Sequence, residues 1–286
     1  MIDPLSREAG YTYVVVYWIA CRAGLCAVSH LYRRFQGAVF RNARLLRVWG
    51  PPGYDNAENG EHRFPVLYLN DGQNLFQAET SYTGVEWQMD ETADRLIREG
   101  KISPLIVVGI DHGGKDRMKE YVPYRSFSPA ILRPQGRRYP EFLMDEVMPF
   151  VARKYRVAAG TENVALGGSS LGGLIALYTA MARPGMIGRL LIESPSLFMS
   201  SRQLLREARG FKQWPQRVYM AMGTRESGRP DRDQSFVNDV LRLAQNMKES
   251  GLGEDRLRVN IAEGAAHSEA EWAKRLPDAM EFLFRP

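Results

Sequence analysis

Short apolar runs alternate with longer amphipathic stretches along most of this chain. The runs are continuously apolar rather than alternating, as expected of parallel strands that helices cover on both faces. They lie at residues 64–71, 104–111, 163–170, 189–196, 217–223 and 256–264. Between them, apolar side chains recur at helical spacing, which predicts helices over residues 87–98, 139–155, 171–181, 236–247 and 269–284. This alternation predicts an α/β fold with a mainly parallel sheet.

The domain organisation follows from the same pattern. The chain shows no internal repeat and no low-complexity linker, so we predict a single domain over residues 30–286. Residues 38–49 are expected to add antiparallel strands at one edge of the sheet.

Residues 1–29 form an extension with a short apolar run at 13–21, which Arg22 ends. The run is too short for a membrane span, and the segment lacks the basic start of a signal peptide. We expect an extra strand or helix packed on the domain. A degenerate export signal and a translated extension without selected structure are the alternatives. The expected location is therefore the cytoplasm, with export left open, and membrane association is not expected.

Composition narrows the function classes. Apolar residues make up 44% of the 286 positions and charged residues 25%, as in ordinary globular proteins, and the net charge is +5. The basic residues are scattered and cluster only as pairs such as Arg137-Arg138, so nucleic-acid binding is not expected. The two cysteines, Cys21 and Cys26, lack the spacing of a zinc site. The sequence fits a disulfide between them and two free thiols equally well.

One short motif carries candidate chemistry. The pattern Gly-x-Ser-x-Gly occurs once, at residues 168–172, and alone it is weak evidence. An apolar strand runs into it and a helical pattern leaves it, which is the strand-turn-helix context of a nucleophile elbow. A phosphate-binding loop would need a lysine here, the dinucleotide-binding glycine pattern is absent, and a flexible linker would not have apolar flanks.

Two adjacent serines compete for the nucleophilic position. Only Ser170, not Ser169, has glycine two residues before and two residues after it, which keeps side chains out of a tight turn. The amide of Leu171 would then begin a helix and could donate to an oxyanion. A second donor is expected from the loop after an earlier strand, at Gly72 or Gln73 in "YLNDGQNLF".

A serine hydroxyl needs a base, and this type of fold orders the residues serine, acid, histidine along the chain. Only one of the four histidines, His267, follows the serine. For the acid we favour Glu226, which is nearest to the end of the strand at 217–223. The other candidates are Asp231 and Asp233 in the same loop and Glu193 in "IESPS".

With these residues the chain resembles the Putative esterase branch of the α/β-hydrolases. That branch includes enterochelin esterases, feruloyl and acetyl-xylan esterase domains and mycolyltransferases. The matching stretches cover residues 46–284 in family order: "PPGYDN", "FPVLYLNDGQNLF", "PLIVVGIDHGG", "RMKEYVPY", "YPEFLMDEVMPFVARKYRV", "LGGSSLGGLIALYTAMARP", "ESPSLF", "GTRES" and "GAAHSEAEWAKRLPDAMEFLF".

The resemblance implies an α/β-hydrolase fold, with helices on both faces of the central sheet, Ser170 as nucleophile and His267 as base. "GTRES" is similar to the stretch in which feruloyl esterase-like members carry the acid, which supports Glu226. Some trilactone esterases work with a serine-histidine pair alone. The sequence departs from the family at Trp49-Gly50, where such proteins often continue a strand, and residues before about 30 match nothing in it.

The sequence therefore predicts a serine carboxylic-ester hydrolase that acts through an acyl-enzyme, without metal or cofactor, on a small short-chain or aryl ester. The same site would suit a siderophore trilactone, a feruloyl or acetyl-sugar ester, or acyl transfer to an alcohol; a non-catalytic binding protein is the remaining class. Trp87, Arg117 and Tyr121 are candidate substrate contacts. The sequence does not fix the oligomeric state.

Overall fold

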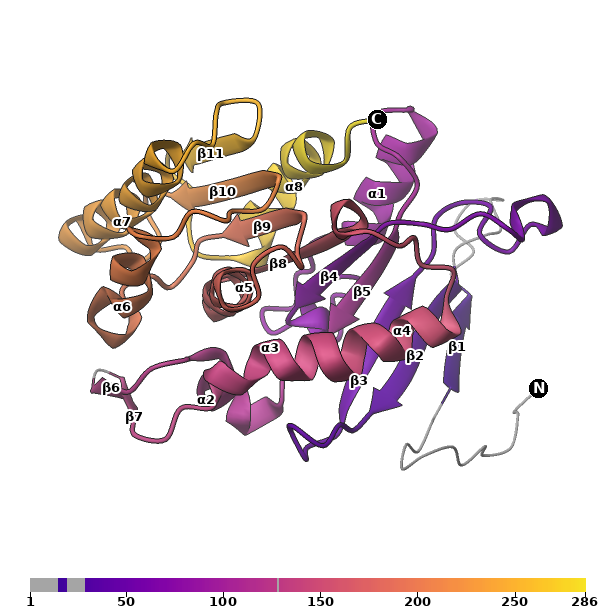
Figure 1. The fold of residues 1–286 in the computed structure, drawn as a ribbon, viewed down its shortest axis with the longest axis horizontal. Coiled ribbons are helices and arrows are strands. Elements are labelled where there is room, and N and C mark those ends of the chain that lie inside the picture. Colours follow the sequence, from indigo (N-terminus) through magenta and orange to yellow (C-terminus); the bar gives the residue numbers. More distant parts are fainter. Residues whose placement is uncertain (1–14, 20–28, 128) are drawn as a thin grey trace.

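The computed structural model describes residues 15–19, 29–127 and 129–286. Its core is a sheet of nine strands in the order β1-β2-β3-β5-β4-β8-β9-β10-β11 (Figure 1). The strands are β1 (Val15–Ile19), β2 (Ser29–Phe35), β3 (Arg44–Trp49), β4 (Val66–Asn70), β5 (Ile106–Ile110), β8 (Val164–Ser169), β9 (Arg189–Glu193), β10 (Arg217–Gly223) and β11 (Leu257–Ala262). The sheet is parallel from β5 through β11, and β1, β2 and β3 are antiparallel. All six predicted parallel strands are therefore confirmed.

Helices cover both faces of the sheet. They are α1 (Met89–Arg98), α2 (Arg117–Tyr121), α3 (Tyr139–Glu141), α4 (Met148–Lys154), α5 (Leu171–Ala182), α6 (Met199–Ala208), α7 (Pro230–Glu249) and α8 (Glu269–Phe284), and a π-helical segment, Phe142–Val147, joins α3 to α4. Short 3-10 turns lie at Ala57–Asn59, Gly72–Asn74, Gly114–Asp116, Gly136–Arg138 and Thr161–Asn163. None of the described helices combines the length and apolarity needed to cross a membrane.

Strand β4 shows why the strands are continuously apolar. Val66 and Tyr68 are buried in the core under α4, α5 and α7, whereas Leu67 and Leu69 are buried in a second core under α1 and α8. Successive side chains of a strand point to opposite faces, so a strand covered on both sides is apolar at nearly every position, and in β4 the polar Asn70 stands at the C-terminal end. The predicted α/β fold with helices on both faces is confirmed.

The prediction of antiparallel strands within residues 38–49 is confirmed for residues 44–49 and wrong for residues 38–43. Only Arg44–Trp49 forms a strand there, and it is not an edge strand, because β2 and β1 extend the sheet beyond it. The amides of Ala38 and Val39 donate to Glu146 Oε1 at 2.7 and 3.0 Å, so these amides are not available to a neighbouring strand.

The extension contributes one described strand. β1 pairs antiparallel with β2, with Val15 opposite Arg33, so residues 15–19 join the same sheet as the extra strand that we expected. The remaining expectations for the extension, including those for Cys21 and Cys26, lie outside the described residues.

Two helical features were missed. Helix α7 begins at Pro230, before the predicted start at 236, because its first turn is polar and acidic, as helix N-termini favour. Helix α6 was not predicted. A small hairpin, β6 (Ser126–Phe127) with β7 (Ala130–Ile131), was not predicted either.

Candidate active site

Ser170 lies at the turn between β8 and α5, with φ 55° and ψ −123°. A positive φ is unfavourable for a non-glycine residue and persists only where neighbours hold it. Here the Ser170 amide donates to the carbonyl of Glu193 at 2.9 Å, and the Ser170 carbonyl accepts from the amides of Leu174 and Ser196, each at 3.1 Å. This geometry is that of a nucleophile elbow.

The glycines around Ser170 are required by close contacts. A Cβ on Gly168 would lie 2.8 Å from the carbonyl carbon of Gly172, and a Cβ on Gly172 would lie 2.9 Å from Asp71 Oδ2. Both positions therefore exclude a side chain, which is the steric reason for the glycine spacing in the motif.

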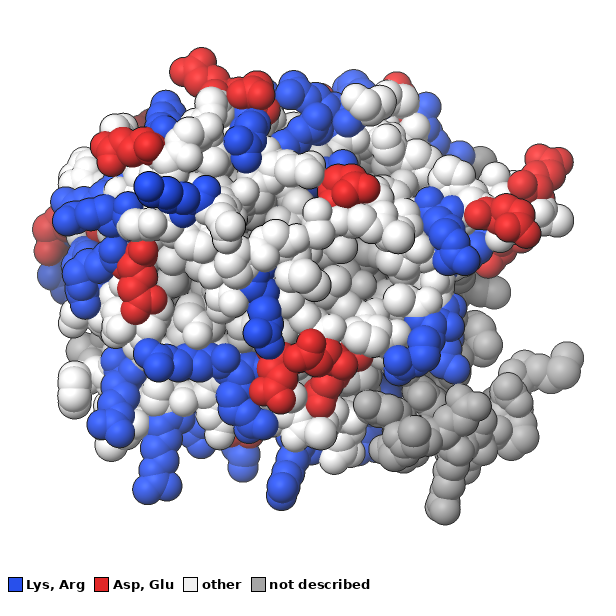
Figure 2. Space-filling view, in the orientation of Figure 1, with Lys and Arg blue, Asp and Glu red and all other residues white. Residues whose placement is uncertain are grey.

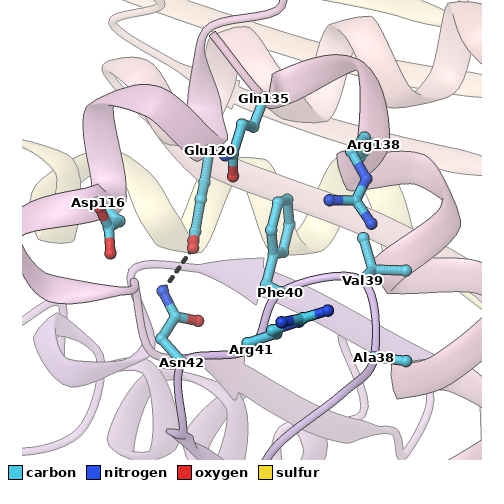
Figure 3. A pocket seen from close by; sticks show the side chains of 9 residues that line it. All are labelled: Ala38, Val39, Phe40, Arg41, Asn42, Asp116, Glu120, Gln135 and Arg138. Carbon is cyan, nitrogen blue, oxygen red and sulfur yellow. Dashed lines mark hydrogen bonds between the residues drawn. The ribbon is translucent and has the colours of Figure 1, made fainter. Parts of the chain in front are cut away.

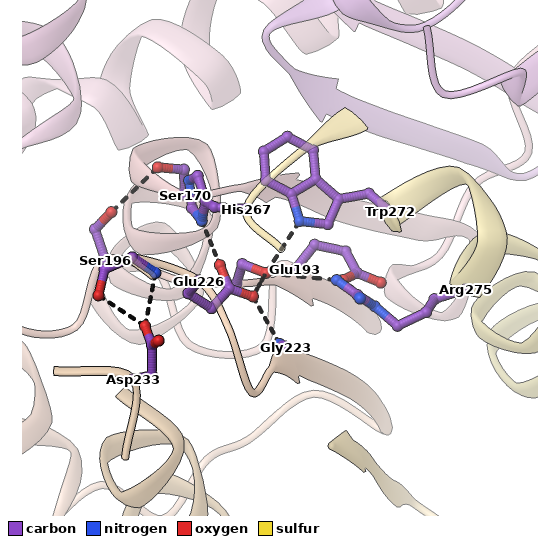
Figure 4. Close-up of polar contacts among 11 residues, drawn as sticks. Ser170, Glu193, Ser196, Gly223, Glu226, Asp233, His267, Trp272 and Arg275 are labelled. Carbon is purple, nitrogen blue, oxygen red and sulfur yellow. Dashed lines mark hydrogen bonds and ion pairs between the residues drawn. The ribbon is translucent and has the colours of Figure 1, made fainter. Parts of the chain in front are cut away.

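Ser170 opens into a cavity of about 490 Å³. The cavity is lined by Asp71, Gln73, Asn74, Tyr82, Thr83, His112, Gly114, Arg117, Ser169, Ser170, His267, Glu269 and Trp272. The Ser170 hydroxyl lies 3.2 Å from that of Ser196 (Figure 4), and Ser169 is buried at the end of β8. The two residues proposed as nucleophile and base thus line one cavity.

His267 is held by a buried carboxylate. Its Nδ1 lies 2.5 Å from Glu226 Oε2, and the Glu226 side chain is only 2% exposed. Burial alone would raise the pKa of Glu226. The hydrogen bond and charge of His267, with hydrogen bonds from Ser194 and Gly223, instead hold that pKa below its usual value. Glu226 therefore stays an ionised acceptor for Nδ1, and the second ring nitrogen of His267, Nε2, is not engaged by Glu226.

The other acidic candidates have different partners. Asp231 is exposed and lies 3.4 Å from Arg229. Asp233 accepts from the amide and hydroxyl of Ser227 at 2.6 and 2.7 Å. Within the described residues, Glu226 is the one of the four candidates that hydrogen-bonds to His267.

The fourth candidate, Glu193, is fully buried and accepts from Arg275 Nη2 at 2.8 Å. Burial raises the pKa of Glu193 to about 7, although the charge and hydrogen bonds of Arg275 oppose that shift. It lies behind the Glu226–His267 pair rather than in contact with it (Figure 4).

Ser194 fixes the far oxygen of Glu226. Its hydroxyl accepts from Trp272 Nε1 at 3.0 Å and from Arg275 Nη2 at 3.4 Å, and it donates to Glu226 Oε1 at 2.7 Å. A hydroxyl has one hydrogen and two lone pairs, so two incoming donors direct its hydrogen to Glu226. The Trp272 ring also meets the His267 ring edge-on, with centroids 5.0 Å apart.

Backbone amides suited to an oxyanion lie on two sides of the elbow. Leu171 is the first residue of α5, so its amide has no acceptor within the helix. Opposite it, Asp71 has φ 59° and turns the chain into the 3-10 turn that begins with Gly72 and Gln73. The side-chain amide of Asn70 donates to the carbonyl of Gly172 at 2.8 Å, which ties this loop to the elbow.

Arg117 lines the cavity, as expected of a candidate substrate contact. Its Nε and Nη2 donate to Asp71 Oδ1 and Oδ2, both at 2.7 Å, so the pair is neutral as a unit. Trp87 and Tyr121 do not line the cavity. Trp87 is buried against Trp272, and Tyr121 is fully buried edge-on to Tyr139, so the structure places both side chains in the core.

Tyr82 is a cavity residue that the sequence did not indicate. Its side chain is 88% exposed, yet its amide donates to Asn74 Oδ1 at 3.1 Å. The next residue, Thr83, donates to Glu269 Oε2 at 2.8 Å, and Asn74 Nδ2 donates to Glu269 Oε1 at 3.1 Å. The loop therefore holds an exposed aromatic residue in the lining of the cavity that Ser170 also lines. No cluster of three or more potential metal ligands occurs among the residues described.

Known proteins share both the sequence pattern and the fold. The sequence model of the family described as "Putative esterase" matches residues 39–283. The uncharacterised protein YbbA of Bacillus subtilis (strain 168) is 25% identical over 247 residues, which cover 84% of this chain and 92% of YbbA. An endo-1,4-beta-xylanase/feruloyl esterase of Xylanibacter ruminicola is 26% identical over 243 residues, which cover 85% of this chain and 29% of that protein.

Among solved structures, the siderophore hydrolase EstB from Aspergillus nidulans has a TM-score of 0.65 at 20% identity. The match covers 92% of this chain and 97% of EstB, so the two share their fold over nearly their whole lengths.

Proposed function

This chain belongs to the Putative esterase family and is an ester hydrolase, and we propose that it works through an acyl-enzyme on Ser170. One observation carries the proposal: Ser170, at a strained elbow, shares a cavity with His267, whose Nδ1 is bound by the buried carboxylate of Glu226. A serine, a histidine and an acid in this relation form the triad of acyl-transfer enzymes.

In the first half-reaction, Ser170 Oγ attacks the ester carbonyl carbon while His267 Nε2 takes the hydroxyl proton. The carbonyl oxygen becomes an oxyanion, and the amides of Leu171 and of Gly72 or Gln73 donate to it. The carbon–oxygen bond to the alcohol then breaks, and His267 returns its proton to the leaving alkoxide. The alcohol departs and the acyl group remains on Ser170.

In the second half-reaction, water replaces the alcohol. The water oxygen attacks the acyl carbon while His267 takes a proton from the water, and the same backbone amides donate to the second oxyanion. The bond to Ser170 Oγ breaks, Oγ recovers its proton from His267, and the carboxylic acid leaves. Glu226 keeps His267 in the required tautomer and stabilises the imidazolium in both halves.

The proposed substrate is a small-molecule ester with a short or aromatic acyl group. The exposed ring of Tyr82 at the cavity and the hydrogen-bonding groups of Arg117 and Gln73 support it. A siderophore ester, a feruloyl or acetyl-sugar ester, and acyl transfer to an alcohol use the same steps. Turnover of p-nitrophenyl acetate and butyrate, methyl ferulate and enterobactin, each with and without added alcohol, separates these alternatives.

Replacing each serine of the motif tests the assignment. In Ser170→Ala, we expect hydrolysis of p-nitrophenyl acetate and labelling by a fluorophosphonate probe to be lost in a protein that remains folded. Ser169→Ala is the matched control, since it removes the adjacent hydroxyl, and it should still be labelled. Undiminished turnover by folded Ser170→Ala would refute the proposal.

A further inference from the structure

A second hollow has a volume of about 430 Å³ (Figure 3). It is lined by Ala38, Val39, Phe40, Arg41, Asn42, Asp116, Glu120, Gln135 and Arg138. These residues come from the loop between β2 and β3, from α2 and the turn before it, and from the segment before α3. The hollow shares no lining residue with the catalytic cavity.

The loop that forms one wall is fixed without regular secondary structure. At the start of the loop, the amides of Ala38 and Val39 donate to Glu146. At its end, Asn42 Nδ2 donates to Glu120 Oε1 at 2.6 Å. Gln36 Nε2 donates across the loop to the carbonyl of Arg41 at 2.8 Å. A Cβ on Gly113 would lie only 2.5 Å from Asn42 Nδ2, so the two loops are in close contact. The hollow is therefore preformed, as binding sites usually are.

The acidic groups of the lining each have a basic partner. Both oxygens of Glu120 accept from Arg44 Nη2, at 2.8 and 3.0 Å, and its side chain is 2% exposed. Asp116 lies 3.6 Å from Lys119 Nζ. Arg44 thus compensates the buried charge of Glu120, and Lys119 offsets part of the charge of Asp116 at the surface.

The two basic groups of the lining are not neutralised. Within the described part of the chain, the guanidinium groups of Arg41 and Arg138 form no ion pair and no hydrogen bond, and the Arg138 guanidinium lies 6.0 Å from the centroid of the Phe40 ring. In Figure 3 the two guanidinium groups approach Val39 and Phe40 from opposite sides. Figure 2 shows Lys and Arg predominating along the lower left margin, where Figure 1 places α2, β6 and β7.

We propose that this hollow binds a small anion through a carboxylate or phosphate group held between Arg41 and Arg138. The planar fork of a guanidinium matches both groups and pairs with them bidentately. Two uncompensated positive charges at a concave surface concentrate anions there and repel cations. A neutral ligand would not compensate the two guanidinium charges. The side-chain amides of Gln135 and Asn42, which also line the hollow, can donate further hydrogen bonds to an anion.

Titration with inorganic phosphate, acetate and citrate, each at constant ionic strength with sodium chloride, tests this site and separates phosphate from carboxylate ligands. Calorimetry should show saturable binding of at least one of the three anions. In Arg41→Gln/Arg138→Gln its affinity should fall about tenfold or more, because charge-assisted hydrogen bonds are lost. The control Arg133→Gln/Arg209→Gln removes the same charge from exposed positions outside the hollow and should bind as the wild type does.

The same titration on Ser170→Ala and on fluorophosphonate-labelled protein separates this site from the catalytic cavity. Binding should persist in both, whether or not Ser170 proves to be the nucleophile. The proposal is overturned if none of the three anions binds saturably, if both double variants weaken binding equally, or if labelling abolishes it.

Discussion

Glu226 Oε2 lies 2.5 Å from His267 Nδ1 across 41 residues of sequence. The fold creates this contact because β10 and β11 are parallel neighbours, so the loops that follow them meet at one edge of the sheet. Glu226 follows β10 and His267 follows β11, and Ser170 follows β8 at the same edge. The remaining oxygen of Glu226 is fixed by Ser194 and the amide of Gly223.

Glu226→Gln tests the role of this contact. The variant keeps the shape of the side chain but loses the charge that stabilises the imidazolium of His267. We expect kcat/KM for p-nitrophenyl acetate to fall about 10²- to 10⁴-fold, as with triad acids elsewhere. Asp231→Asn, at an exposed acid of the same region, is the control and should retain activity. If Glu226→Gln is as active as the wild type, Glu226 is not the acid that assists His267.

Trp272→Phe tests how the acid is positioned. It removes the N–H that donates to Ser194 and keeps an aromatic ring beside His267. The Ser194 hydroxyl then loses a partner that directs its hydrogen to Glu226, so we expect kcat to fall about tenfold with little change in KM and a shifted pH–rate profile.

Trp87→Phe provides the comparison for Trp272→Phe, because Trp87 packs on Trp272 but makes no bond to Ser194. Losses of the same size in both variants, with unshifted pH profiles, would indicate general loosening of the core instead of a positioning role.

The raised pKa of Glu193 predicts how the stability of the protein depends on pH. Burial raises its pKa from 4.5 to about 7 in the folded protein. When the pKa of a carboxyl group is higher in the folded than in the unfolded protein, the group stabilises the fold fully at pH values below its unfolded-state pKa. This contribution to the free energy of unfolding is lost as the pH rises through the folded-state pKa. In urea unfolding between about pH 4.5 and pH 8, Glu193→Gln should therefore gain stability relative to the wild type as pH rises. A difference that stays constant or moves the other way contradicts the raised pKa.

Tyr82 is expected to act in substrate binding rather than in folding. Because its ring is 88% exposed, Tyr82→Ala should leave the melting temperature nearly unchanged. Loss of an aromatic contact should raise KM for esters with an aromatic acyl group, such as methyl ferulate, about three- to tenfold, with a smaller effect on p-nitrophenyl acetate, whose acyl group is not aromatic. Tyr82→Phe retains the ring and should behave as the wild type. If KM is unchanged in Tyr82→Ala, the ring does not touch the substrate.

The sequence was sufficient for those features that depend on local pattern. Strands buried on both faces are nearly continuous apolar runs, so β4 and β8 could be predicted from the local sequence pattern. The glycine spacing that distinguished Ser170 from Ser169 is itself a local sequence pattern, although the contacts that require it include Asp71 from the loop after β4. His267 could be selected because no other histidine follows the serine.

Features that depend on distant packing could not be read in this way. Trp87 and Tyr82 are both aromatic residues near the same loop, yet one is buried against α8 and the other is exposed at the cavity. Ser194 gains its partners from α8 and from the loop after β10, which no local pattern indicates. Residues 38–43 were expected to be part of a strand, but the amides of Ala38 and Val39 donate to Glu146, which is more than 100 residues away in the sequence.

The central claim is that an acyl group passes through Ser170, and mass spectrometry of a quenched reaction tests it most directly. The protein is mixed with p-nitrophenyl butyrate, quenched in acid during turnover and digested. We expect the peptide that contains Ser170 to carry the mass of one butyryl group, located on that serine, and the adduct to be absent in Ser170→Ala. Turnover with unmodified Ser170 and the butyryl group on another residue would contradict the account.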